Sequence, residues 1–211
     1  MIRLPVSVGE AVDKWNILQI KRGAVVDSHK AAFIAAELQQ LAPELEPLLE
    51  QEPIRRLYAY LDYFNREIWT LCDAVRGAVI DTHYAQHCIN IIKYNDARFR
   101  VKNQINQWAS STLREQKNFN PQRLGVRWGG EIWDSVAPVV RYLSFCYDEV
   151  VLAAAECPAV FRDDRNVTVA PELEHCVAIL TWHPDTLREQ LRTDLQIDYD
   201  RIVHLADAPS S

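Results

Sequence analysis

The stretch from Ile89 to Asn106 constrains the fold more than any other part of this chain, because it carries two side-chain stripes at helical spacing. The first stripe is apolar and consists of Ile91, Tyr94, Val101 and Ile105. The second is polar and consists of Asn95, Arg98, Lys102 and Asn106. A polar row beside an apolar seam is typical of either a hydrogen-bonded network between helices or the floor of a ligand site. The stretch therefore predicts one long helix, which we expect to begin at a cap formed by Asp81 and Thr82 and to end or bend near Trp108.

A second helix, again with an apolar stripe beside a polar one, is predicted from about Ile54 to Val79. Its apolar face consists of Leu57, Leu61, Phe64, Ile68, Leu71 and Val75. A polar-edged stripe beside it consists of Asn65, Trp69, Asp73 and Arg76. If the two helices pair, these edges meet, and we expect Asp73 to form a buried ion pair with Arg98 or Lys102. Burying such a pair is costly unless it is fully hydrogen-bonded.

The chain opens with a helix start. Ser7 and Glu10 form a capping box, in which the Ser7 hydroxyl accepts from the backbone N–H of Glu10. Glu10 and Lys14 have the spacing of a helical ion pair. The structural interpretation is a well-made helix start, and the functional alternative is a polar pocket lined by Glu10, Asp13, Lys14 and Lys21.

Between these helices we expect a helix from His29 to Leu41, followed by short turns in the acidic, proline-containing segment from Pro43 to Pro53. Further along, His83 and His87 have metal-ligand spacing on a helix, but neither an HExxH arrangement nor an obvious third carboxylate accompanies them. The sequence predicts no metal and no cofactor.

The pattern changes after the turn signal at Asn118–Pro121, where we place the domain boundary. Short strands are predicted at 123–128, 148–153, 166–169, 176–182 and 201–205, with helices at 131–146 and 186–195. The run from Cys176 to Trp182 is continuously apolar, as in a buried parallel strand. The fold class is therefore α+β: an antiparallel helical bundle at 1–120, then a small Rossmann-like α/β domain at 121–211 with βαβ connections and a mostly parallel sheet.

Ligands of open parallel sheets bind at the carboxyl ends of the strands. Two features of this chain fall there, the Gly129–Gly130 turn and His183. The turn lacks a GxGxxG fingerprint, so dinucleotide binding has little support, and a histidine that caps a loop explains His183 without a ligand.

Composition narrows the function classes. The 211 residues carry a net charge of −6, which argues against a general nucleic-acid binder. Five cysteines are scattered without a CxxC, and no secretory signal or membrane-spanning run is apparent. These features predict a cytoplasmic location with reduced thiols and no membrane span.

Several of these segments resemble an uncharacterised bacterial family, domain of unknown function 6165. The similarity covers roughly residues 5 to 120 and rests on the segments at 6–21, 65–76, 94–106 and 115–117. Trp15 and Asn16 depart from the family, which has an aliphatic residue and a threonine at these positions. The resemblance implies a context of bacterial surface-polysaccharide and glycosyltransferase genes, but no assigned reaction.

The later segments from Gly130 to Val167 are similar to the first Rossmann-like half of some sugar transferases. Those proteins begin this half with GLGD, where this chain has Trp128-Gly129-Gly130-Glu131. The chain ends at Ser211, and we do not expect a complete two-domain transferase.

Three hypotheses follow. The first is an accessory or ligand-binding protein of surface-glycan assembly, which recognises a sugar-phosphate-type anion or a glycosyltransferase partner. The second is a small enzyme acting on an anionic molecule, with Asp73 or Glu10 as base and Arg98 and Lys102 as an electrostatic clamp. The third is a structural network with function at an oligomer interface. The candidate ligand-binding residues are Glu10, Lys14, Asn65, Asp73, Arg76, Asn95, Arg98, Lys102 and Asn106.

Overall fold

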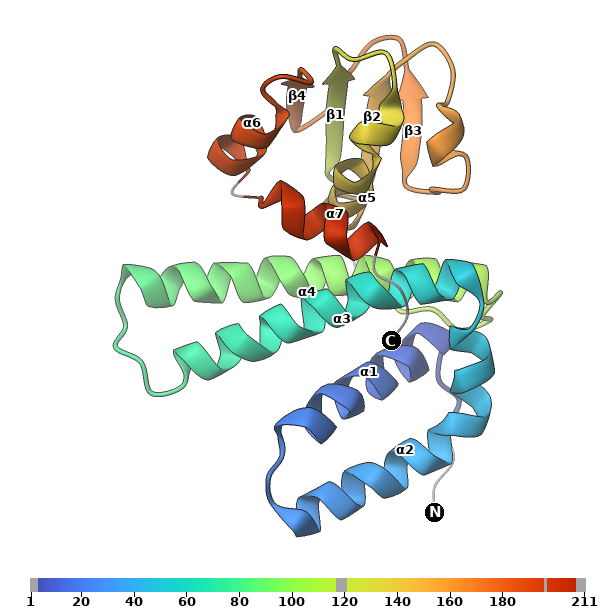
Figure 1. Cartoon of the computed structure of the whole chain (residues 1–211), viewed down its shortest axis with the longest axis vertical. Coiled ribbons are helices and arrows are strands. Elements are labelled where there is room, and N and C mark those ends of the chain that lie inside the picture. The colour runs from blue at the N-terminus through green and yellow to red at the C-terminus, as the bar shows by residue number, and fades with distance from the viewer. Residues whose placement is uncertain (1–3, 117–120, 196, 208–211) are drawn as a thin grey trace. The chain divides into compact units, whose positions relative to one another are not determined.

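The computed structural model describes residues 4–116, 121–195 and 197–207, which form two compact units at 1–117 and 118–211. The first unit is helical, with α1 at Val8–Ala24, α2 at Ser28–Leu49, α3 at Glu52–Val75 and α4 at Thr82–Trp108 (Figure 1). The second unit is a small α/β unit with a four-stranded sheet. The fold class predicted from the sequence is therefore confirmed. Most of the expected turn at Asn118–Pro121 lies outside the described residues.

The helical unit is built around the α3–α4 hairpin, against which α1 packs from one side. Val101 and Ile105 of the predicted seam are fully buried, as are Leu61 and Phe64 of α3. The expected cap and end of α4 are confirmed, since Asp81 accepts from the N–H of Tyr84 and the helix ends at Trp108. The polar edges of α3 and α4 are thereby placed beside a buried apolar core.

Helix α2 differs from the prediction, because it continues through Pro43 and Pro47 to Leu49. A proline inside a helix removes a backbone donor and bends the helix rather than always ending it. Figure 1 shows α2 changing direction in its later part. Burial of Leu38 and Leu45 on either side of Pro43 holds this helix against the core.

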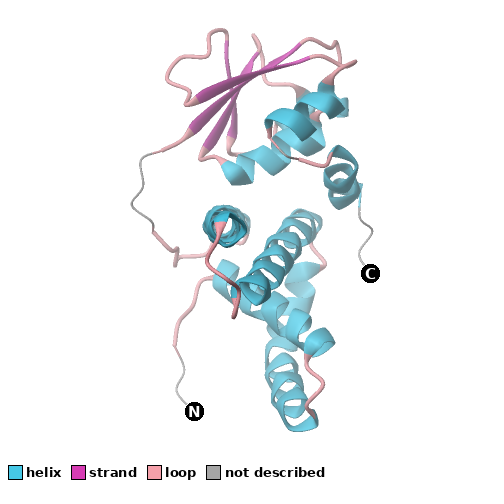
Figure 2. Ribbon diagram, turned by 90° about the vertical axis from the view of Figure 1, so that its left-hand side faces the viewer, coloured by secondary structure: helices cyan, strands magenta, loops and turns pink. Residues whose placement is uncertain are grey.

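The second unit contains β1 at Arg123–Trp128, η1 at Trp133–Ser135, α5 at Ala137–Cys146, β2 at Glu149–Ala153, η2 at Ala159–Phe161, β3 at Val167–Ala170, β4 at Ala178–Trp182, α6 at Leu187–Asp194 and α7 at Tyr199–Asp207. All strand pairs are parallel, in the order β3-β2-β1-β4. Figure 2 shows the strands as one layer with the helices of this unit gathered on one side.

Two predictions for this unit are corrected. The segment 201–205 lies within helix α7, which packs against α5 and buries Ile202. A short apolar run does not by itself distinguish a strand from a helix. The predicted buried strand at 176–182 begins at Ala178 and lies at the sheet edge, where Ile179 remains 45% exposed.

All five cysteines are free thiols. Among the described residues, no helix is long and apolar enough to cross a membrane.

Candidate functional site

Helices α1 and α4 approach each other closely at Gly9. The backbone N–H of Gly9 donates to Asn106 Oδ1 at 2.6 Å, and a Cβ at this position would clash with the backbone carbonyl oxygen of Lys102. Glycine is therefore needed for close approach rather than for an unusual backbone angle. The contact brings the first turn of α1 alongside the polar stripe of α4.

Lys102 lies at this crossing, with only 10% of its side chain exposed. Its Nζ donates to Glu10 Oε1 at 2.5 Å and to Glu115 Oε2 at 2.9 Å. Burial by itself would lower the pKa of Lys102, but the hydrogen bonds to Glu10 and Glu115 outweigh it and raise that pKa. The Lys102 ammonium is thus committed to two carboxylates of its own chain.

The confirmed part of the capping box is the bond from the Glu10 N–H to Ser7 Oγ, at 3.2 Å. The Glu10 carboxylate binds Lys102 instead of Lys14, and Lys14 pairs with Glu37 at the surface, 3.3 Å away. The predicted Glu10–Lys14 ion pair is therefore wrong. Glu10 pairs with the buried ammonium of Lys102, whereas the side chain of Lys14 is more than half exposed and points to another partner at the surface.

Arg98 is held by Asp13, one helical turn of α1 beyond Glu10. Its Nε donates to Asp13 Oδ1 at 2.9 Å and its Nη2 donates to Asp13 Oδ2 at 2.5 Å, which makes the pair bidentate. The hydrogen bond to Asp13 raises the pKa of Arg98 above its ordinary value despite partial burial. Nη1 of Arg98 donates to Asn95 Oδ1 at 3.3 Å.

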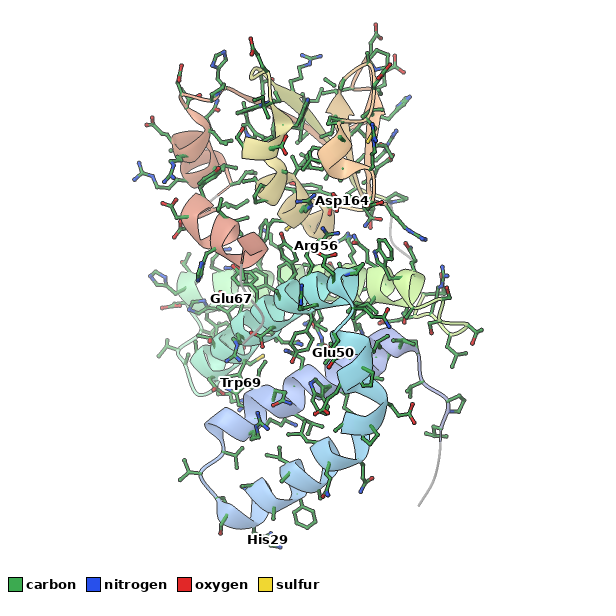
Figure 3. The ribbon with its side chains drawn as sticks, turned by 45° about the vertical axis from the view of Figure 1, so that its right-hand side comes forward. His29, Glu50, Arg56, Glu67, Trp69 and Asp164 are labelled. Atoms are coloured by element: carbon green, nitrogen blue, oxygen red, sulfur yellow. The ribbon has the colours of Figure 1, made fainter. Side chains whose placement is uncertain are left out.

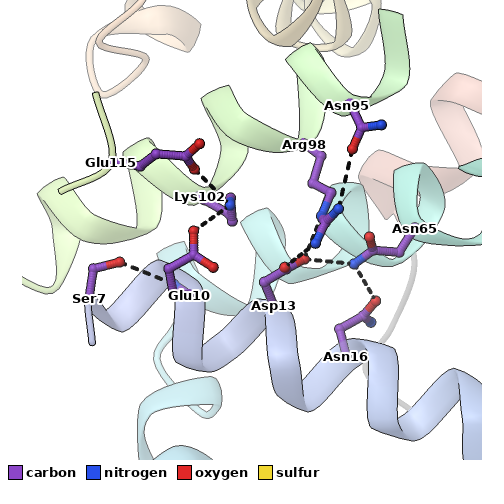
Figure 4. Close-up of polar contacts among 9 residues, drawn as sticks. All are labelled: Ser7, Glu10, Asp13, Asn16, Asn65, Asn95, Arg98, Lys102 and Glu115. Carbon is purple, nitrogen blue, oxygen red and sulfur yellow. Dashed lines mark hydrogen bonds and ion pairs between the residues drawn. The ribbon is translucent and has the colours of Figure 1, made fainter. Parts of the chain in front are cut away.

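A chain of buried amides supports Asp13 from the other side. Asn65 Nδ2 on α3 donates to Asp13 Oδ1 at 3.0 Å and to Asn16 Oδ1 at 2.9 Å, and Asn16 Nδ2 donates to Asp62 Oδ1 at 2.9 Å. Figure 4 shows most of this network, with Asp13 of α1 between Arg98 of α4 and Asn65 of α3. The network fixes Asp13, and through it the Arg98 guanidinium.

A pocket of about 190 Å³ opens next to this network, between α1, α3 and α4. Its lining consists of Ile17, Asn65, Ile68, Trp69, Cys72, Asp73, Arg76 and Arg98. Figure 3 shows Trp69 on α3. Asp73 and Arg76 form an ion pair of 3.1 Å with exposed fractions of 55% and 78%, so they lie at the solvent-facing side of the lining.

The structure thus divides the residues predicted from the sequence into three groups. Asn65, Asp73, Arg76 and Arg98 share the pocket, and Asn95 contacts Arg98. Glu10, Lys102 and Asn106 belong to the polar network but do not line the pocket, while Lys14 is at the surface. The predicted pairing of Asp73 with Arg98 or Lys102 is wrong, because Asp13 and Glu10 occupy those cations and Asp73 pairs with Arg76.

Asp13 was predicted only in the alternative of a polar pocket at the first helix, and Asn16 and Glu115 were not predicted as site residues. Asp13 and Asn16 are 2% and 0% exposed, and each is a polar residue on the side of α1 that also carries buried Val12 and Ile20. A short polar side chain on an otherwise buried helix face indicates an internal partner. That signal was available for Asp13 and Asn16, whereas nothing local indicated Glu115.

In the α/β unit, the predicted Gly129 and His183 do lie together. The N–H of Gly129 donates to the carbonyl of Trp182 at 2.9 Å, and a Cβ on Gly129 would be 2.8 Å from His183 Cδ2. The exposed His183 therefore packs on the Gly129 backbone at the carboxyl ends of β1 and β4.

No group of three metal-binding side chains occurs among the described residues, and His83 and His87 acquire no third ligand there. Comparison of the chain with family models, with curated proteins and with solved structures found no match. The chemistry of the pocket is therefore inferred from its own residues.

Proposed function

We propose that the helical unit binds a small anionic ligand of the sugar-phosphate type in the pocket beside Arg98, as an accessory protein of bacterial surface-polysaccharide assembly. One observation carries this proposal. Asn65, Asp73, Arg76 and Arg98, which were predicted as ligand residues from two separate polar stripes, meet at one pocket that also contains Trp69. A small cavity with an apolar lining and a few convergent polar groups is the usual form of a ligand site.

Arg98 is suited to bind an anion because it is held in place before a ligand arrives. A guanidinium has five N–H donors. Two of those of Arg98 bind Asp13 and one binds Asn95, and the remaining two make no hydrogen bond to any described residue. A donor whose orientation is already fixed loses little conformational entropy on binding.

The biological context of the proposal rests on the resemblance to the domain of unknown function 6165 family. The resemblance adds a place beside glycosyltransferases, and the cytoplasmic location comes from the composition of the sequence. Recognition of such a transferase as a protein partner is the second form of the same hypothesis. It would use the same polar edges of α3 and α4.

The enzyme alternative is narrowed by the geometry. Glu10 is bonded to Lys102 and does not line the pocket, so Asp73 is the candidate base that shares a cavity with Arg98. Lys102 is likewise not available to the proposed clamp. The alternative therefore reduces to Asp73 as base and Arg98, aided by Arg76, as the anion-binding group.

The structural hypothesis is favoured for the other half of the network. Lys102, Glu10 and Glu115 satisfy one another, and Asn106 binds the backbone of Gly9. We infer that these residues hold α1 against α4 and that the residues lining the pocket bind the ligand.

The proposal is tested by calorimetric titration and thermal shift with glucose 1-phosphate, glucose 6-phosphate and inorganic phosphate. A ligand at a hundred times its Kd should stabilise the protein by about 2.7 kcal/mol. Arg76→Ala should weaken binding by about tenfold or more, because it removes a charged hydrogen-bond donor. Arg66→Ala is the matched control, since Arg66 is also on α3 and pairs with an aspartate but does not line the pocket.

Binding that is equally strong in Arg76→Ala and Arg66→Ala would place the ligand elsewhere. No binding of any of these phosphates would remove the ligand hypothesis and leave the protein partner. Conversion of a bound sugar phosphate into another compound would favour the enzyme alternative, provided that Asp73→Asn abolishes this conversion.

A further inference from the structure

The charged groups at the pocket balance one another before any ligand is bound. Arg98 is neutralised by Asp13 at 2.9 and 2.5 Å, and Arg76 is neutralised by Asp73 at 3.1 Å. The lining itself carries two guanidinium groups and one carboxylate, and Asp13, which pairs with Arg98 but is not part of the lining, balances the second guanidinium. An anionic ligand would therefore meet the Asp73 carboxylate as well as the two arginines.

The two ion pairs differ in how easily they open. The side chain of Asp13 is only 3% exposed and also accepts a hydrogen bond from Asn65, so separating it from Arg98 would leave a buried charge without its partner. Asp73 and Arg76 are exposed to 55% and 78%, and each has only the other as its described charged partner. Exposed pairs of this kind contribute little to stability and exchange partners readily.

These observations fix which pocket charges a ligand can use. The Asp13–Arg98 pair stays closed, and Arg98 offers its two remaining N–H groups to an anionic group. A ligand that bears both charges can open the Asp73–Arg76 pair, which would make the Asp73 carboxylate available to its cationic group and Arg76 available to its anionic group. The pocket then presents the fixed Arg98 guanidinium and the released Arg76 guanidinium to an anion, and the Asp73 carboxylate to a cation.

We propose that the ligand of this pocket is a small zwitterion, in which a phosphate or carboxylate binds Arg98 and a protonated amine binds Asp73. This inference rests on the proposed function and specifies its ligand class as an amino compound. Its ammonium group takes the place of Arg76 at Asp73, so the ligand adds less negative charge to the site than a phosphate without an amine does. Trp69 adds an aromatic surface, which attracts an ammonium group more than a hydroxyl.

The volume of the pocket limits the size of the ligand. At about 190 Å³ it lies below the range of about 300–1,000 Å³ that accommodates drug-sized molecules. A single amino-sugar ring or a smaller amino compound suits this volume, with its phosphate or carboxylate at Arg98 and its amine at Asp73. A nucleotide sugar is too large to be enclosed.

The test compares glucosamine 6-phosphate with glucose 6-phosphate, which differ in one substituent, an ammonium in place of a hydroxyl. Calorimetric titrations at pH 7 on the full chain give the ratio of the two affinities. We expect the amino compound to bind about two- to fivefold more tightly in the wild type, the range of an exposed ion pair. In Asp73→Asn the ratio should fall to about one.

Glu52→Gln is the matched control, because Glu52 is also an exposed carboxylate on α3 in a short-range ion pair, with Arg56, but does not line the pocket. The wild-type ratio should persist in this variant. Equal affinities in the wild type, or a preference that survives in Asp73→Asn, would overturn the zwitterion inference. If the amino compound shows no preference but glucose 6-phosphate still binds in an Arg76-dependent manner, the proposed function stands and only the zwitterion inference fails. If neither sugar phosphate binds, both proposals fail.

Discussion

Asp13 and Arg98 are separated by 85 positions in the sequence and form a bidentate ion pair whose carboxylate is 3% exposed. The pair joins α1 to α4, and Asn65 ties it to α3 through a third hydrogen bond. Three helices of the bundle therefore meet at one carboxylate. Arg98 of this pair lines the pocket, so the stability of the bundle and the geometry of the candidate site depend on the same contact.

Replacement of Arg98 by alanine is expected to lower the free energy of unfolding by about 3 kcal/mol, because it leaves the buried Asp13 carboxylate without its partner. Urea denaturation followed by circular dichroism measures this loss. Lys14→Ala, which breaks an exposed pair with Glu37, should lose less than about 1 kcal/mol. Similar losses in both variants would show that Asp13 is not desolvated as described.

Replacement of Gly9 by alanine is expected to destabilise the helical unit by about 1–3 kcal/mol, because the new Cβ would clash with the backbone carbonyl of Lys102 and force α1 away from α4. Gly23 provides the control within the same helix, since a Cβ there has nothing within 4 Å. Gly23→Ala should be stabilising by up to about 1 kcal/mol. Melting temperatures of the two variants should therefore shift in opposite directions, and a stabilising Gly9→Ala would contradict the close α1–α4 contact.

Lys102 should make the helical unit sensitive to alkaline pH. Its pKa in the folded protein is raised above the ordinary value of 10.5, so its stabilising contribution is complete below pH 10.5 and is lost as the pH rises through the folded-state pKa. The free energy of unfolding, measured between pH 9 and 12, should fall less steeply in Lys102→Met than in the wild type. Parallel curves for the two proteins would rule out this role.

Glu149 should contribute to acid sensitivity of the α/β unit. Its partial burial would raise the pKa, but hydrogen bonds from Thr168 at 2.6 Å and Arg123 at 2.5 Å lower it below the ordinary value of 4.5. The contribution is therefore present above pH 4.5 and disappears as the pH falls through the folded-state pKa. Unfolding of Glu149→Gln between pH 6 and 3 should depend less on pH than that of the wild type, and Thr168→Val should lie between them.

Local periodicity was enough to predict the helices at the centre of the site. The stripes of α3 and α4 recur at helical spacing, so the sequence indicated that Asn65, Asp73, Arg76, Arg98 and Lys102 lie along polar edges beside an apolar core. The cap at Asp81 was predicted for the same reason, because capping depends on residues within one turn. The helix through Pro43 and Pro47 and the helix at 199–207 were missed, since burial against other elements decided them.

The sequence by itself determined which side chains lie on which helix face, because that depends on the 3.6-residue repeat and on local caps. Only the tertiary structure decided which acid neutralises which base. From the sequence, Asp73 is the expected partner of Arg98 or Lys102, whereas in the structure Asp13 and Glu10 bind these cations, and the choice depends on how far α1 slides along α4. The close approach at Gly9 sets that position, so Asp13 faces Arg98, Glu10 faces Lys102, and Asp73 remains at the open side of the pocket with Arg76.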